Sequence, residues 1–116
     1  MSRDLFVQDL PQGIASVDEI PSDWRPTSLP FGQAEVLAVV LALAPEADLT
    51  DPAWVHVSLP GADIEVCFAD GAPLTSFALH VRAADHAIAD EWVRRLLNHL
   101  GARALDSDSA TGLFDA

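Results

Sequence analysis

Three consecutive segments of the chain alternate apolar and polar residues with a period of two. They read WVHVSL (54–59), DIEVCFA (63–69) and LTSFALHVR (74–82). Successive side chains of a β-strand point to opposite faces of its sheet, so this alternation predicts three strands that each have one apolar and one polar face. Short turns at Pro60-Gly61 and Asp70-Gly71 favour tight antiparallel connections, and the three strands therefore form a meander.

Two-residue turns fix which residues face each other. They place Val57 opposite Ile64 in the first hairpin and Ile64 opposite Phe77 in the second. The apolar residues then share one face, and a slip by one residue would turn all of them outward. We expect one core that contains Val55, Val57, Ile64, Val66, Phe77, Leu79 and Val81 together with Trp92 and Leu96. The opposite, open face gathers His56, Ser58, Asp63, Glu65, Cys67, Ser76, His80 and Arg82.

The segments before the meander predict a strand, a long loop and a helix. Residues 4–10 (DLFVQDL) alternate as a strand with Leu5 and Val7 on one face. Residues 11–30 contain four prolines and predict a surface loop with one helical turn, held against the domain by its apolar residues. Residues 33–44 (QAEVLAVVLALA) are rich in alanine and leucine and predict a helix that Pro45 ends.

The segments after the meander predict a second helix and a closing hairpin. Residues 84–100 carry an apolar stripe at helical spacing, Asp85 can cap the N-terminus, and Gly101 is a natural stop. The solvent side of this helix offers the ion pairs Asp90–Arg94 and Glu91–Arg95. The final segments ARALD and GLFD predict two short strands around a turn.

Together these elements predict a single α+β domain over residues 1–116. The expected fold is a two-layer sandwich in which a mainly antiparallel sheet carries both helices on one face, in the order β-α-β-β-β-α-β-β. A chain of this size supports one hydrophobic core.

The charge of the chain limits its partners. The net charge is −12, from 18 acids against six arginines, and the chain contains no lysine. Nucleic acids and anionic membranes attract proteins through clustered lysine and arginine, so we expect neither as a partner. Acidic chains can mimic a nucleic acid or bind a basic protein, but we favour the interpretation that this charge serves solubility.

The sequence predicts a cytoplasmic protein. The start of the chain, MSRDLFVQD, has acids where a signal peptide has a basic end followed by an apolar run. No apolar run approaches the roughly 20 residues that cross a bilayer. Cys67 has no second cysteine to pair with, which excludes an internal disulfide and two-cysteine metal motifs.

Candidate catalytic residues lie on the open face of the meander. The expected register puts His56 beside Glu65 with Ser76 on the next strand, and His80 and Arg82 share that face. A hydrolytic serine sits on a sharp turn near oxyanion donors, whereas Ser76 lies within a strand. We therefore favour an ordinary polar row, and an inert Cys67, over a catalytic group.

A metal site is a weaker candidate. His80, Asp85 and His86 lie at a strand end and a helix start, where three ligands can converge on zinc. Their spacing matches no zinc motif and Asp85 has a capping role, so a structural interpretation is favoured. No phosphate-binding glycine motif occurs, and we predict no cofactor.

Three stretches, DLFVQDLP, LHVRAAD and RALDSDSATGLFD, resemble a family of small uncharacterised bacterial proteins. The resemblance covers most of the length and implies a complete single-domain protein. No function is assigned to that family, so the resemblance implies neither an activity nor a ligand.

The leading functional hypothesis is a small non-catalytic binding or regulatory protein, such as an immunity protein. The alternative is a small or metal-dependent enzyme that uses His56, Glu65, His80 or Arg82 on the open sheet face. The helix at 33–44 adds a hypothesis about self-association, because its last nine residues carry no polar side chain. Either the loop at 11–30 covers this helix, or a homodimer forms through Leu37 and Leu41. We favour the dimer, because prolines and acids fit poorly against an apolar helix.

Overall fold

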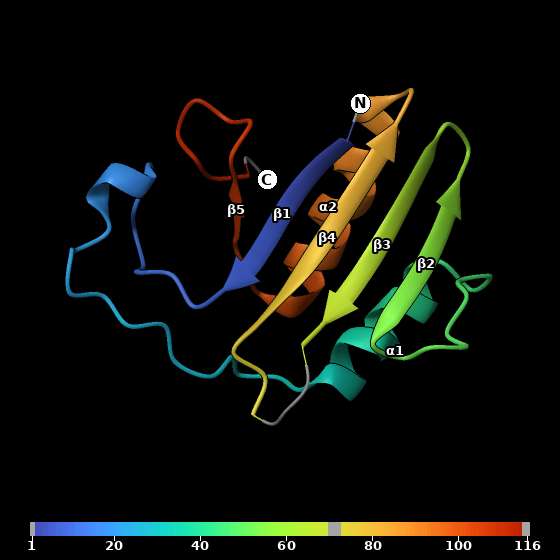
Figure 1. Cartoon of the computed structure of the whole chain (residues 1–116), viewed down its shortest axis with the longest axis horizontal. Helices are drawn as coiled ribbons and strands as arrows, with labels where there is room; N and C mark the ends of the chain where they lie inside the picture. Colours follow the sequence, from blue (N-terminus) through green and yellow to red (C-terminus); the bar gives the residue numbers. More distant parts are fainter. Residues whose placement is uncertain (1, 70–72, 115–116) are drawn as a thin grey trace.

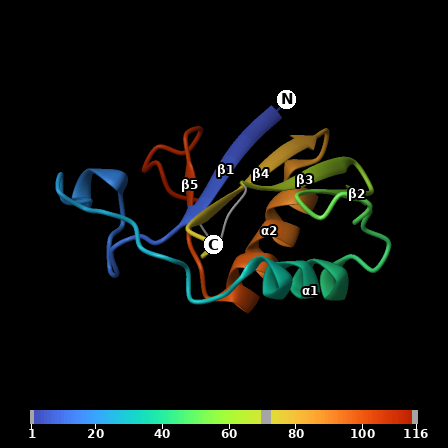
Figure 2. The same cartoon turned by 60° about the horizontal axis from the view of Figure 1, so that its bottom comes forward.

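The computed structural model describes residues 2–69 and 73–114, and within them five strands form one antiparallel sheet in the order β2-β3-β4-β1-β5 (Figure 1). The strands are β1 (Ser2–Gln8), β2 (Trp54–Leu59), β3 (Ala62–Phe68), β4 (Ser76–Ala83) and β5 (Ala104–Asp106). The helices are α1 (Gln33–Leu43), α2 (His86–Leu100) and the short 3-10 helix η1 (Val17–Glu19). Figure 2 shows α1 and α2 on the same side of the sheet, which confirms the predicted two-layer α+β sandwich.

The meander forms with one register as predicted and one shifted. β2 and β3 pair Val57 with Ile64, as the short turn at Pro60-Gly61 requires. β3 and β4 pair Ile64 with Val81 instead of Phe77, so the predicted register of the second hairpin was wrong by four residues. The predicted turn at Asp70-Gly71 lies outside the described residues. Because four is an even number, the shift leaves every side chain on its predicted face.

The core is the predicted one. All nine of its members are buried: Val55, Val57, Ile64, Val66, Phe77, Leu79, Val81, Trp92 and Leu96. Leu5 and Val7 of β1 join them, as does one stripe of α1 that includes Val36 and Val40. Each fully buried aliphatic side chain of this size contributes about 1.5–3 kcal/mol. Burial therefore fixes which face of the sheet remains open.

The first strand lies inside the sheet, between β4 and β5. It begins and ends two residues earlier than residues 4–10, and it pairs with both neighbours in antiparallel fashion. β4 and β5 consequently run parallel to each other, with β1 between them and α2 as their connection (Figure 1). The predicted closing hairpin is reduced to β5 and an isolated bridge between Leu105 and Leu113.

The ends of α2 are capped as the sequence indicates. The Asp85 carboxylate accepts a hydrogen bond of 3.0 Å from the Ala87 amide, so the helix begins at His86, two residues later than expected. Gly101 ends it with a φ of 64°, a conformation that glycine adopts without strain.

One of the two expected ion pairs on α2 forms. Arg95 binds Glu91 at 3.2 Å as predicted, but Arg94 also binds Glu91, at 2.8 Å. Asp90 instead accepts Arg3 from β1 at 3.1 Å. The sequence could not show this contact, because it depends on α2 lying beneath β1.

Arg3 joins three distant parts of the chain. Its guanidinium lies 3.1 Å from Asp90 and 3.3 Å from the buried Asp106, and 5.3 Å from the centre of the Phe114 ring. Asp106 also accepts a hydrogen bond from the Asp108 amide at 3.0 Å. Arg3 thereby holds the C-terminal loop against β1 and α2.

The long loop at 11–30 is held against that C-terminal loop. The Val17 amide donates to the Thr111 carbonyl at 2.9 Å, and the Arg103 side chain donates to the Ile14 carbonyl at 2.9 Å. Figures 1 and 2 both place η1 far from α1, so this part of the loop does not cover that helix. On α1, Leu37 packs against the core, whereas Leu41 is 41% exposed.

Candidate functional site

The face of the sheet opposite the two helices, here called the outer face, carries the polar residues of the meander. His56, Ser58, Asp63, Ser76 and Arg82 are exposed there, and Glu65, Cys67 and His80 are partly exposed. The period-two alternation therefore assigned every one of these residues correctly. All four candidate catalytic residues, His56, Glu65, His80 and Arg82, lie on this one face.

Four ionisable residues form a row across the outer face. His56, Glu65, His80 and Asp4 are directly paired neighbours on β2, β3, β4 and β1. The expected place of Ser76 in this row was wrong, because the shifted β3–β4 register pairs Glu65 with His80 instead. The structure therefore forms no Ser, His and Glu row.

Trp54, at the start of β2, is held on two sides. Its indole N–H donates to the Glu65 carboxylate, and its ring stacks on His80 with the ring centres 6.0 Å apart and an interplanar angle of 28°. The indole still remains 53% exposed. Trp54 was not among the predicted site residues, although it has the same parity in its strand as His56.

Asp4 is the second residue that the sequence analysis missed. Its carboxylate lies 2.6 Å from Nδ1 of His80. Its alternation with Leu5 places it on the outer face, but nothing in the sequence shows that β1 lies beside β4. Long-range packing alone creates this pair.

Glu65 is largely enclosed but only partly satisfied. Its side chain is 16% exposed, and one carboxylate oxygen accepts the Trp54 indole. The other oxygen, Oε1, lies 3.8 Å from Arg82, which is too long for a hydrogen bond. Arg82 itself is 73% exposed and weakly held.

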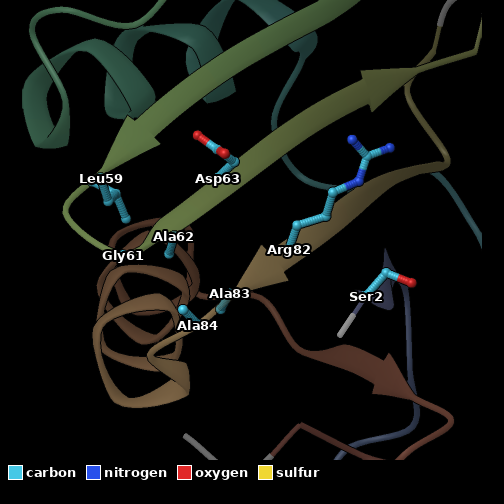
Figure 3. A pocket seen from close by; sticks show the side chains of 8 residues that line it. All are labelled: Ser2, Leu59, Gly61, Ala62, Asp63, Arg82, Ala83 and Ala84. Carbon is cyan, nitrogen blue, oxygen red and sulfur yellow. The ribbon is translucent and has the colours of Figure 1, made fainter.

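Two shallow hollows meet on this face. The first has a volume of about 290 Å³ and is lined by Ser2, Asp4, Trp54, Glu65, His80, Val81 and Arg82. The second has a volume of about 640 Å³ and lies at the end of the sheet, around the β2–β3 turn (Figure 3). Ser2 and Arg82 line both. Figure 3 shows Asp63 and Arg82 extending from neighbouring strands on the same face.

Cys67 is protected from ionisation. Partial burial, and then the negative charges of Glu65 and Asp4, raise the pKa of its thiol to about 11. The thiolate is the reactive form of cysteine, so Cys67 is a poor nucleophile at neutral pH.

The structure does not gather the candidate metal ligands. His80 lies within β4 and contacts Asp4, Asp85 caps α2, and His86 belongs to α2, in the layer beneath the sheet. Across residues 2–69 and 73–114, no three His, Cys, Asp or Glu residues are grouped so as to hold a metal ion.

No protein-family model, curated protein or solved structure matches this chain. None of the helices in the described part of the chain is long and apolar enough to span a bilayer.

Proposed function

We propose that the protein is a small, non-catalytic binding or regulatory protein that docks a basic partner protein on the outer face of its sheet. The observation that carries this proposal is a pair of exposed aromatic side chains, Trp54 and Phe6, on the sheet face opposite α1 and α2. An immunity protein, which blocks the surface of its target, is one form of this function.

The aromatic residues mark the centre of the proposed interface. Trp54 is 53% exposed and Phe6 is 45% exposed. Cys67 and Ala78 lie between them in the strand pairing, which makes a continuous apolar row across the sheet. Tryptophan dominates the energetics of many interfaces, and a side chain that is already held in place loses less entropy on binding.

Acidic groups surround this row and select the class of partner. Asp4, Asp63 and Glu65 lie on the outer face, and Asp48 pairs with the edge of β2 at His56. Arg82 is the arginine that lies on the outer face with these acidic residues. The whole chain has a net charge of −12. Such a field accelerates encounter with a cationic protein and weakens in salt.

The proposed location is the cytoplasm. Cys67 is the single cysteine of the chain and is partly exposed. Reducing systems in the cytoplasm keep such a thiol free, whereas oxidising compartments favour paired cysteines.

Site-specific photo-cross-linking tests the docking proposal. A benzoylphenylalanine at Phe6 probes the outer face, and the same group at the exposed Asn98 on α2 is the control. In an extract of the source organism, we expect the Phe6 position to capture a basic protein and the Asn98 position not to. The capture should weaken as salt screens the charges. Equal capture from both positions, or capture that salt leaves unchanged, would contradict the proposal.

A small enzyme remains the second candidate, because Asp4 and His80 have the geometry of an oriented general base. Their atoms are 2.6 Å apart, and Glu65, His56 and Arg82 lie on the same face. The described residues offer this base no activated nucleophile, since Cys67 stays protonated. Hydrolysis of small activated esters that is lost in His80→Asn would support this candidate, and equal rates in both proteins would count against it.

Self-association through α1 is a separate proposal. The exposed residues of this helix are Ala34, Glu35, Ala38, Leu41 and Ala42, with Leu41 as their large apolar group. The described hydrogen bonds of the proline-rich loop join it to Asp9, Leu74, Arg103 and Thr111 and not to α1. A two-fold pairing of α1 with its copy would cover Leu41 on both chains.

A further inference from the structure

We propose that the hollow over Glu65 receives one arginine side chain of the partner, and that Arg82 occupies its entrance in the free protein. This inference rests on the proposed docking function and names the chemical group that the outer face recognises.

The Glu65 carboxylate can accept a further hydrogen bond. Its side chain is 16% exposed, and Oε1 accepts no hydrogen bond from the described part of the protein but remains open to a donor that enters from outside. A partly enclosed carboxylate attracts a positive charge more strongly than a fully solvated one does, because its surroundings screen the charges less. A donor that enters the hollow of about 290 Å³ would satisfy this oxygen, and a charged donor would do so most strongly.

Trp54 forms one wall of the same hollow. Trp54 is fixed by its hydrogen bond to Glu65 and by stacking on His80, with more than half of its surface still exposed. A planar guanidinium can lie against an indole and donate to a carboxylate at the same time. An ammonium group makes the ionic contact but stacks less well, so the combination favours arginine over lysine.

Arg82 also lines this hollow. It lies 3.8 Å from Glu65 Oε1, so the hollow already contains a weakly placed guanidinium from the chain itself. Asp63 is its direct partner on β3, on the same face (Figure 3). When a partner arginine enters, Arg82 can move from Glu65 to Asp63 without losing its ion pair. Asp63 is then shared with His56, whose Nε2 lies 3.7 Å away.

Amide-capped amino acids test the inference without the partner. The probes are acetyl-arginine methylamide, its neutral isostere acetyl-citrulline methylamide, and acetyl-lysine methylamide, titrated into ¹⁵N-labelled protein. The three tryptophans give three indole N–H signals, and the signal that is lost in Trp54→Phe identifies Trp54. We expect the arginine probe to shift the Trp54 signal saturably and to leave Trp24 and Trp92 unchanged. Citrulline should have little effect, and lysine should bind more weakly than arginine.

Two pairs of charge-matched variants locate the contact. Glu65→Gln keeps an acceptor for the indole but removes the charge, and we expect about tenfold weaker binding of the arginine probe. Glu35→Gln, on the exposed start of α1, changes the net charge equally and should weaken binding less than about twofold. Arg82→Gln removes the competing guanidinium and should strengthen binding about threefold. Arg25→Gln, in the loop, is its control and should have no such effect.

Several results would overturn the inference. Equal shifts with citrulline and arginine would show that the positive charge is not recognised. Equal or tighter binding of lysine would show that the guanidinium group is not preferred. If Glu65→Gln and Glu35→Gln bind the arginine probe with equal affinity, the probe does not bind at Glu65. An Arg82→Gln protein that binds like Arg25→Gln would show that Arg82 does not occupy the entrance. The titration needs no partner, so it can fail while cross-linking at Phe6 succeeds, and the two proposals are tested separately.

Discussion

Asp4 and His80 are 76 positions apart in the chain, yet Oδ1 of the first lies 2.6 Å from Nδ1 of the second. The pair joins β1 to β4 on the outer face, next to the Trp54 ring that stacks on His80. It shows that β1, although first in the sequence, belongs to the middle of the candidate site.

The coupling energy between Asp4 and His80 should be small. Both side chains are substantially exposed, and exposed ion pairs contribute about 0.2–1 kcal/mol. A double-mutant cycle of Asp4→Asn and His80→Asn, measured by urea unfolding, should give a coupling energy in that range at pH 6. A coupling energy near zero would show that the two groups do not interact in solution.

Arg3→Ala should be strongly destabilising. It removes the cation that the buried Asp106 contacts at 3.3 Å and leaves that carboxylate uncompensated. The loss of one partner from a buried pair costs about 3–5 kcal/mol. Arg25→Ala, which removes an arginine from an exposed loop position, should change the unfolding free energy by less than about 0.5 kcal/mol. Equal small effects of the two substitutions would contradict the role of Arg3.

Gly112→Ala should loosen the contact between the two loops. Gly112 has a φ of 76°, and an added Cβ would lie 2.6 Å from Cγ1 of Val17. Gly13 is a matched control, because its φ is 78° but nothing lies within 4 Å of an added Cβ. Both changes cost about 1–2 kcal/mol of backbone strain. Gly112→Ala should cost more than Gly13→Ala in thermal unfolding, and similar costs would show that Val17 does not pack there.

Cys67 should titrate near pH 11. The chain contains no tyrosine and no lysine, so Cys67 is the only side chain expected to ionise between pH 9 and 11. Thiolate absorbance at 240 nm should therefore rise with a midpoint near 11, and iodoacetamide should react slowly at pH 8.

The raised pKa of Cys67 also affects the free energy of unfolding at alkaline pH. The folded thiol keeps its proton above pH 9, whereas the unfolded thiol loses it near the ordinary pKa. Between these pH values the unfolded state binds fewer protons than the folded state. The contribution of Cys67 to the free energy of unfolding is therefore complete below about pH 9 and is lost as the pH rises toward 11. In Cys67→Ala, the free energy of unfolding measured in urea should no longer fall between about pH 9 and pH 11. If the free energy of unfolding still falls with pH in the variant, another group causes the fall.

Leu41→Glu should abolish self-association if α1 forms the dimer contact. Leu41 is the better test than Leu37, which packs against the core and would unfold the protein when charged. Light scattering at high concentration should give the mass of a dimer for the natural chain and of a monomer for Leu41→Glu. Asn98→Glu on α2 adds the same charge and should remain dimeric. A natural chain that is already monomeric would end this proposal.

The sequence by itself determined the local features of this protein. Alternation with a period of two set the faces of β2, β3 and β4, and hence both the core and the polar members of the outer face. The short turn at Pro60-Gly61 set the β2–β3 register, while Asp85 and Gly101 set the ends of α2. These features depend on neighbours in the chain, so the sequence contains them directly.

The tertiary structure decided which distant residues meet. A shift of four residues between β3 and β4 keeps every apolar side chain in the core, so alternation could not distinguish Val81 from Phe77 as the partner of Ile64. In the same way, Leu5 and Val7 would be buried beside any strand of the sheet, and only the packing of the complete core placed β1 between β4 and β5. That placement brought Asp4 to His80 and Arg3 to Asp90 and Asp106. Burial of apolar area is non-directional, so it fixes which face of a strand is inside but does not select the neighbouring strand.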